Sequence, residues 1–91
     1  MTGIRDNTSA ARFEMQTEWG LAILDYHDTL DAISLDHTEV PEGAAGKGVG
    51  ARFVLGVLDD IRARGRKIIP RCPFVQRMLK LHPQYADLIL S

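Results

Sequence analysis

The sequence predicts a small α/β (α+β) domain with a mixed sheet of about four strands, built from an antiparallel three-strand meander, a β-α-β crossover and C-terminal helices. Two observations predict this fold. Before Pro41, apolar residues follow strand periods and are separated by short turns. After Pro41, a glycine-rich segment leads into a long helical period and then a short apolar run. The chain has 91 residues, which suits a single domain over residues 1–91.

The first half of the chain is expected to contain three strands after a loose lead-in over residues 1–11. Residues 13–17 alternate between apolar and polar side chains, which is the period of a half-buried strand. A more apolar strand over 21–26 and a third strand over 32–40 each follow a short turn. The third strand is expected to project four residues to one face: Ile33, Leu35, His37 and Glu39. Pro41 ends it, because proline has no backbone N–H for the sheet.

The second half begins with apolar residues that recur every four positions, as in a helix: Val49, Phe53, Val57 and Ile61. Gly65 supplies a C-terminal stop, and residues 67–70 then form a short apolar strand. This strand should lie parallel to the third strand, because the helix between them completes a β-α-β crossover. A second helix is expected to begin at Pro73, and a last short helix to follow His82-Pro83.

Composition narrows the class of protein. The chain has 11 basic and 12 acidic residues and a net charge of −1, whereas a general nucleic-acid binder shows a basic excess. The single cysteine, Cys72, excludes an intramolecular disulfide and a multi-cysteine zinc site, and we expect no metal. No apolar run approaches the roughly 20 residues needed to span a bilayer. The N-terminus lacks the apolar core of a signal peptide, so a cytoplasmic location is expected.

The most informative segment is Gly46-Lys47-Gly48-Val49-Gly50, between a strand and the long helix. Closely spaced glycines allow positive φ angles and close approach to a ligand. The free N–H groups and the dipole of the helix N-terminus favour an anion such as a pyrophosphate. Alternatively, the glycines only make a tight connection. The segment lacks the Lys-Ser/Thr ending of a P-loop, and no second β-α-β unit follows to make a dinucleotide fold.

Four motifs occur in order: His37-Thr38-Glu39-Val40-Pro41, Gly46-Lys47-Gly48-Val49-Gly50, Lys67-Ile68-Ile69-Pro70 with Cys72-Pro73-Phe74-Val75, and His82-Pro83-Gln84-Tyr85-Ala86-Asp87-Leu88. Together they resemble the minimal branch of the Gcn5-related N-acetyltransferase (GNAT) superfamily, over about Phe13 to Leu88. The resemblance implies acetyl-CoA as the cofactor. It also implies that the pyrophosphate lies on the amides of residues 46–51, and that the pantetheine arm lies in a wedge between the strands at 32–40 and 67–70.

The candidate residues for binding coenzyme A are Thr38, Val40, Gly46, Lys47, Gly48, Val49, Gly50, Ala51 and Phe74. The superfamily commonly has Arg or Gln at a position that precedes the Gly-x-Gly of its loop, and at that position before Gly48-Val49-Gly50 this chain has Ala45. A side-chain contact to the phosphates is therefore expected to be missing. Arg77 and Lys80 form an exposed basic edge, which is either solvated or near the adenosine 3′-phosphate.

The candidate catalytic residues are Cys72, Glu39 and His37. Cys72 precedes Pro73 and should be a helix N-cap, where the helix dipole favours the thiolate. It is a proposed nucleophile of the resembled family, or else a small buried hydrophobic residue. His37 and Glu39 share a strand face, and either could be the general base. The alternatives are a core histidine bonded to backbone, and an ion pair of Glu39 with Lys47 or an arginine.

We therefore expect an acetyl-CoA-dependent N-acetyltransferase that acts on an unidentified amine, of a small molecule or a protein. The alternative is a non-catalytic module that binds or senses acyl-CoA. It is supported by the missing N-terminal helices, which build the acceptor pocket in longer superfamily members. A further alternative is a subunit whose substrate site forms only with a partner. We expect no nucleic-acid or membrane partner, and a monomer or weak dimer.

Overall fold

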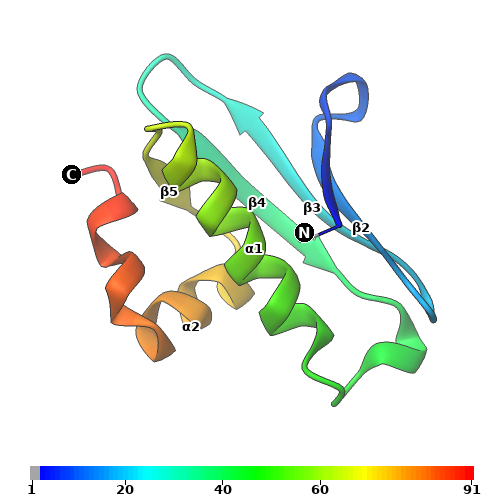
Figure 1. The fold of residues 1–91 in the computed structure, drawn as a ribbon. Helices are drawn as coiled ribbons and strands as arrows, with labels where there is room; N and C mark the ends of the chain where they lie inside the picture. The colour runs from blue at the N-terminus through cyan, green and yellow to red at the C-terminus, as the bar shows by residue number, and fades with distance from the viewer. Residues whose placement is uncertain (1–2) are drawn as a thin grey trace.

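The computed structural model describes residues 3–91 (Figure 1). Its sheet has five strands in the order β1-β2-β3-β4-β5: Ile4–Asn7, Arg12–Thr17, Gly20–Asp28, Ile33–Glu39 and Ile68–Pro70. Two α-helices pack on it, α1 (Val49–Ala63) and α2 (Pro73–Leu81). Three 3-10 helices complete the fold: η1 (Thr8–Ala10), η2 (Glu42–Ala44) and η3 (Pro83–Leu88). None of the helices in the described range is long and apolar enough to cross a bilayer.

The predicted fold class is confirmed, with one strand more than expected. Strands β1 to β4 pair antiparallel, and β4 and β5 pair parallel across the α1 crossover. Both α-helices lie over the same face of the sheet (Figure 1). The apolar stripe predicted for α1 is buried against that face, with Phe53, Val57 and Ile61 fully inaccessible to solvent. The helix ends as predicted, because Gly65 has a φ of +71°, in the left-handed region that glycine favours.

The prediction of a loose lead-in over residues 1–11 is wrong for the part of this segment that the structure describes. Ile4–Asn7 forms β1, paired with β2 in a register that joins Ile4 to Met15 and Asn7 to Arg12. Hydrogen bonds between polar side chains hold β1 against β2. The buried carboxylate of Glu14 on β2 accepts hydrogen bonds from Arg5 (2.7 Å) and Asn7 (3.0 Å). Residues 1–2 lie outside the described range.

A bulge in β4 changes which residues face the helices. Asp25 pairs with His37 and Tyr26 pairs with Leu35, so Asp36 has no partner of its own on β3. Leu35 is fully buried in the core, but the His37 and Glu39 side chains are 59% and 63% exposed. The expectation that they share one face with Ile33 and Leu35 is therefore wrong, because the extra residue reverses the alternation beyond Asp36.

Strands β4 and β5 separate near the middle of β4. Their pairing ends at Leu35 and Pro70, and Leu35 O accepts the last hydrogen bonds, from Arg71 N (3.0 Å) and Cys72 N (2.9 Å). The chain then turns into α2, whereas β4 runs on to Glu39. The two strands therefore diverge, as expected for a wedge at this position.

Candidate functional site

The glycine-rich loop has the backbone geometry that its composition predicts. Gly46 and Gly48 have φ angles of +77° and +75°, in the left-handed region. A Cβ atom at either position would meet nothing within 4 Å, so backbone conformation rather than lack of space favours glycine there. Gly48 is the N-cap of α1, and no side chain caps the helix.

This arrangement leaves backbone donors at the start of α1. Arg52 N donates the first bond of the helix, to Gly48 O at 3.1 Å. The amides of Val49, Gly50 and Ala51 precede that bond and have no acceptor within residues 3–91. They lie at the positive end of a helix of 15 residues. The start of α1 is therefore suited to bind an anion.

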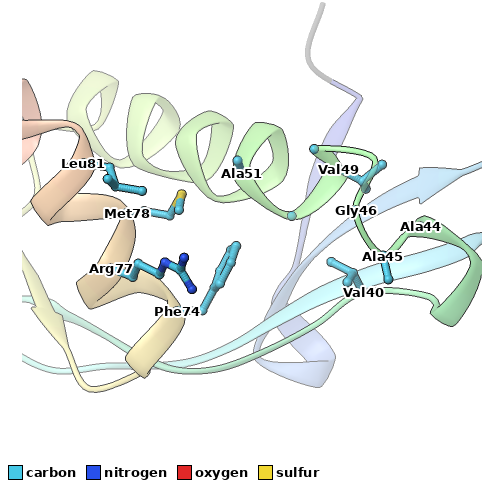
Figure 2. Close-up of a pocket in the computed structure, with 12 residues that line it drawn as sticks. Val40, Ala44, Ala45, Gly46, Val49, Ala51, Phe74, Arg77, Met78 and Leu81 are labelled. Carbon is cyan, nitrogen blue, oxygen red and sulfur yellow. The ribbon is translucent and has the colours of Figure 1, made fainter.

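These amides border a cavity of about 340 Å³. It is lined by the residue after β4, the last residue of η2, the glycine-rich loop, the first turn of α1 and one face of α2: Val40, Ala44, Ala45, Gly46, Gly48, Val49, Gly50, Ala51, Phe74, Arg77, Met78 and Leu81. Figure 2 shows Phe74, Arg77 and Met78 projecting from α2 toward the start of α1, with Val40 on the far side. The cavity thus combines anion donors, apolar walls and one cation.

Gly50 makes room where the two helices approach each other. A Cβ atom on Gly50 would lie 3.0 Å from Phe74 Cζ and 3.6 Å from Val40 Cγ1. The φ of Gly50 is not positive, so its conformation would allow a side chain. Glycine at this position therefore keeps open the space between α1, Phe74 and Val40.

Most of the candidate cofactor-binding residues line this cavity: Val40, Gly46, Gly48, Val49, Gly50, Ala51 and Phe74. Thr38 and Lys47 do not. The sequence reasoning did not assign Ala44, Ala45, Met78 or Leu81 to the site. The sequence does indicate that the α2 residues of the lining lie together, because Phe74, Met78 and Leu81 have the spacing of one helix face. Ala45 lines the cavity where the superfamily often has a longer polar residue, so that wall offers no side-chain donor.

Cys72 is the N-cap of α2, as predicted, with Pro73 as the first helical residue. Its side chain makes no capping bond, and the residue is only 3% exposed. The thiol Sγ lies 3.4 Å from Thr38 Oγ1, across the point where β4 and β5 separate. Cys72 is thus a buried thiol beside a hydroxyl, at the inner end of the wedge.

His37 and Glu39 lie next to each other, with 3.3 Å between Nε2 and Oε2, but on the face of β4 opposite Thr38. Both are largely exposed, so the alternative of a core histidine is wrong. Glu39 pairs with His37 rather than with Lys47. The structure therefore brings Thr38 and Cys72 together on the helix side, and His37 and Glu39 together on the open side.

Glu14, far along the sheet from this cavity, carries a strongly shifted pKa. Hydrogen bonds from Asn7, Arg12 and Arg5 lower the pKa of Glu14 to about 2. The bonds from Asn7 and Arg5 join β1 to β2, and all three bonds account for a buried charge in a structural role. Within residues 3–91, no group of three or more His, Cys, Asp or Glu side chains is arranged to hold a metal ion.

Comparisons with known proteins agree with this architecture. A sequence model of the family described as GCN5-related N-acetyl-transferase matches residues 12–88. The solution structure of a GCN5-like candidate N-acetyltransferase from Staphylococcus aureus is 29% identical, with a TM-score of 0.69. The alignment covers 100% of this chain and 92% of that one. No curated protein matches the sequence. Because the family model spans nearly the whole chain, this protein belongs to the GCN5-related N-acetyltransferase family.

Proposed function

We propose that the protein binds acetyl-CoA and transfers its acetyl group to an amine. One observation carries the proposal, which is the set of three unpaired amides at Val49, Gly50 and Ala51, bordering the cavity at the start of α1. Coenzyme A carries a diphosphate between its adenosine and its pantetheine arm. A diphosphate is the kind of anion that a helix N-terminus binds. Membership of the acetyltransferase family supports the acetyl thioester as the donor.

The remaining walls of the cavity suit the rest of this ligand. Val40, Phe74 and Met78 offer apolar contacts for a pantetheine arm. Arg77 is the one cation in the lining, and its guanidinium is suited to a phosphate such as the 3′-phosphate of the adenosine. The expected loss of a phosphate contact at Ala45 leaves the backbone amides as the main anion donors. Affinity should therefore depend on the loop backbone more than on any single side chain.

Two routes for the acetyl group are compatible with the positions of the candidate catalytic residues. In direct transfer, His37 or Glu39 takes a proton from the acceptor amine on the open face of the sheet, and the amine nitrogen attacks the thioester carbonyl. The bond to the coenzyme A sulfur then breaks, and the thiolate leaves and takes up a proton. In a relay, the Cys72 thiolate attacks that carbonyl first, the bond to the coenzyme A sulfur breaks, and coenzyme A leaves as its thiol. The amine then attacks the acetyl-Cys72 thioester and releases the Cys72 thiolate. Thr38 would take part only in the second route, because its hydroxyl contacts the Cys72 thiol. The acceptor is a small-molecule or protein amine in either case.

The second candidate function is a non-catalytic acyl-CoA binding module. Burial of Cys72 favours it, because reactive cysteines are usually partly exposed. Exposure of His37 and Glu39 favours it too, since neither side chain lies in an enclosed pocket that would hold an acceptor amine against it. Under this alternative the amides of α1 bind the same ligand, but no acetyl group is released.

The first experiment is an NMR titration of the labelled protein with coenzyme A. The amide signals of Val49, Gly50 and Ala51 should shift with saturation, while those of the distant η1 turn stay in place. Unmoved α1 signals at millimolar ligand would refute the binding site. With binding established, incubation with acetyl-CoA and a panel of amines should release free coenzyme A. No release above the uncatalysed rate would favour the binding module.

Mass spectrometry of the same incubation separates the two catalytic routes. A relay adds one acetyl group to the protein, and this added mass should be absent in Cys72→Ala. If transfer is direct, Cys72→Ala retains turnover and no acetyl group appears on the wild-type cysteine. Cys72→Ser is the matched control for packing, because it keeps the size of the side chain but supplies a much weaker nucleophile.

A further inference from the structure

We propose that Trp19, which does not line the cavity, is a positioning residue that holds the anion-binding loop in its binding conformation. This inference rests on the proposed binding of coenzyme A. It concerns the turn between β2 and β3 and the 3-10 helix η2, which precedes the glycine-rich loop. We call Trp19 and Gly43 the brace.

The turn that carries Trp19 is itself well fixed. The Thr17 hydroxyl accepts a hydrogen bond from Trp19 N (3.1 Å) and donates one to Gly20 O (2.6 Å). Gly20 has a φ of +132°, which a residue with a side chain rarely adopts. The indole therefore projects from a turn with little freedom of its own, although Trp19 is still 38% exposed.

The indole packs directly on the backbone of η2. A Cβ atom on Gly43 would lie 2.6 Å from Trp19 Cδ1, which is closer than real Cβ contacts, and 3.2 Å from Cγ. One residue along the turn, a Cβ on Gly20 would lie 3.3 Å from Pro41 Cγ. Among the described residues, no hydrogen bond joins this turn to η2. The brace is therefore a van der Waals contact that only a glycine at position 43 permits.

The contact acts on residues next to the anion donors. Ala44 follows Gly43, is 2% exposed and lines the cavity. Its carbonyl accepts the Lys47 amide at 3.1 Å, which fixes the peptide between the two glycines of positive φ. A loop that is held before binding loses less conformational entropy when the ligand arrives. Removing the indole should therefore weaken coenzyme A binding even though Trp19 touches none of the cavity.

The test compares coenzyme A with pantetheine, which lacks the diphosphate, by NMR titration. Trp19→Ala should raise the Kd for coenzyme A about tenfold, as expected when a preorganised loop becomes mobile. The Kd for pantetheine should stay at the wild-type value, whereas general damage to the fold would raise both. Trp19→Phe keeps a flat ring on Gly43 and should restore most of the affinity. Leu30→Ala is the matched control, because Leu30 is 99% exposed at another turn.

Gly43→Ala tests the other half of the brace. The added methyl should displace the indole and weaken coenzyme A binding in the same direction as Trp19→Ala. In the double variant the clash is gone, so Gly43→Ala should cost little in that background, a non-additivity expected only of groups in contact. Additive losses would overturn the inference, and so would wild-type affinity in Trp19→Ala.

Amide hydrogen exchange separates this inference from the proposed function. Trp19→Ala should speed exchange without ligand at the amides of Ala44, Ala45 and Lys47, which donate hydrogen bonds within this segment, while exchange in the core of α1 stays slow. If the wild-type protein binds no coenzyme A, the proposed function fails, and exchange still reports on the brace. If the wild type binds and exchange at these amides is unchanged in Trp19→Ala, the brace is refuted alone.

Discussion

Gly50→Ala should separate binding from stability, because it adds one methyl group at the wall of the cavity. The methyl would lie 3.0 Å from Phe74 Cζ and 3.3 Å from Cε2, so the far edge of the ring must move by a few tenths of an ångström. Alanine is favoured over glycine inside a helix by about 1 kcal/mol. Displacing a partly exposed ring costs a similar amount, about 0.5–1.5 kcal/mol. The free energy of unfolding should therefore change by less than about 1 kcal/mol.

Binding should change much more. The methyl occupies space between α1, Phe74 and Val40, next to the amides that we assign to the diphosphate. We expect the Kd for coenzyme A to rise at least tenfold, or about 1.4 kcal/mol of binding free energy. Thermal unfolding by circular dichroism gives the stability, and calorimetric titration gives the Kd. Gly56→Ala in the same helix lies outside the cavity lining and should bind like the wild type. Wild-type affinity in Gly50→Ala would refute the assignment of this cavity.

Three further predictions follow from other parts of the fold. Gly48→Ala forces alanine to a φ of +75°, so urea unfolding should show a loss of about 1–2 kcal/mol, with Gly48→Asn in between because asparagine tolerates this region. The pKa of Glu14 is lowered from 4.5 to about 2, so its contribution to the free energy of unfolding is present above pH 4.5 and is lost as the pH falls toward 2. Glu14→Gln should therefore make the free energy of unfolding less dependent on pH between these two values. Tyr85→Phe removes a hydrogen bond of 2.6 Å to Asp59 and should cost about 0.5–1.5 kcal/mol in urea unfolding, without changing coenzyme A affinity.

The parts of the fold that local patterns control could be predicted from the sequence. The period of four in α1 reflects a stripe that is buried along the whole helix, from Val49 to Ile61. The alternation in residues 13–17 corresponds to β2, and the glycines at 46 and 48 adopt the left-handed conformation expected of an anion-binding turn. In each case a residue's own chemistry or its near neighbours determine the structure.

Strand β1 could not be predicted, because its stability comes from distant side chains. Its residues carry little apolar periodicity. Asp6 accepts a hydrogen bond from Tyr26 OH (2.6 Å) and pairs with Arg64 (2.9 Å), far along the chain. These partners are known only once the fold brings them together. The α2 wall of the cavity is similar, since the spacing of Arg77 and Met78 shows a helix face but not what that face meets.

The bulge in β4 has the largest consequence for the chemistry. One unpaired residue, Asp36, places Thr38 rather than His37 beside the Cys72 thiol. Cys72 and the pair of His37 and Glu39 therefore lie on opposite faces of the sheet, and the cavity at the start of α1 is on the side of Thr38 and Val40. Direct transfer would then require the thioester to reach the open face beyond Leu35, where β4 and β5 no longer pair. A relay through Cys72 needs no such passage at its first step. For this reason Glu39→Gln should affect turnover only in the direct route, whereas Thr38→Val should slow acetylation of Cys72 only in the relay.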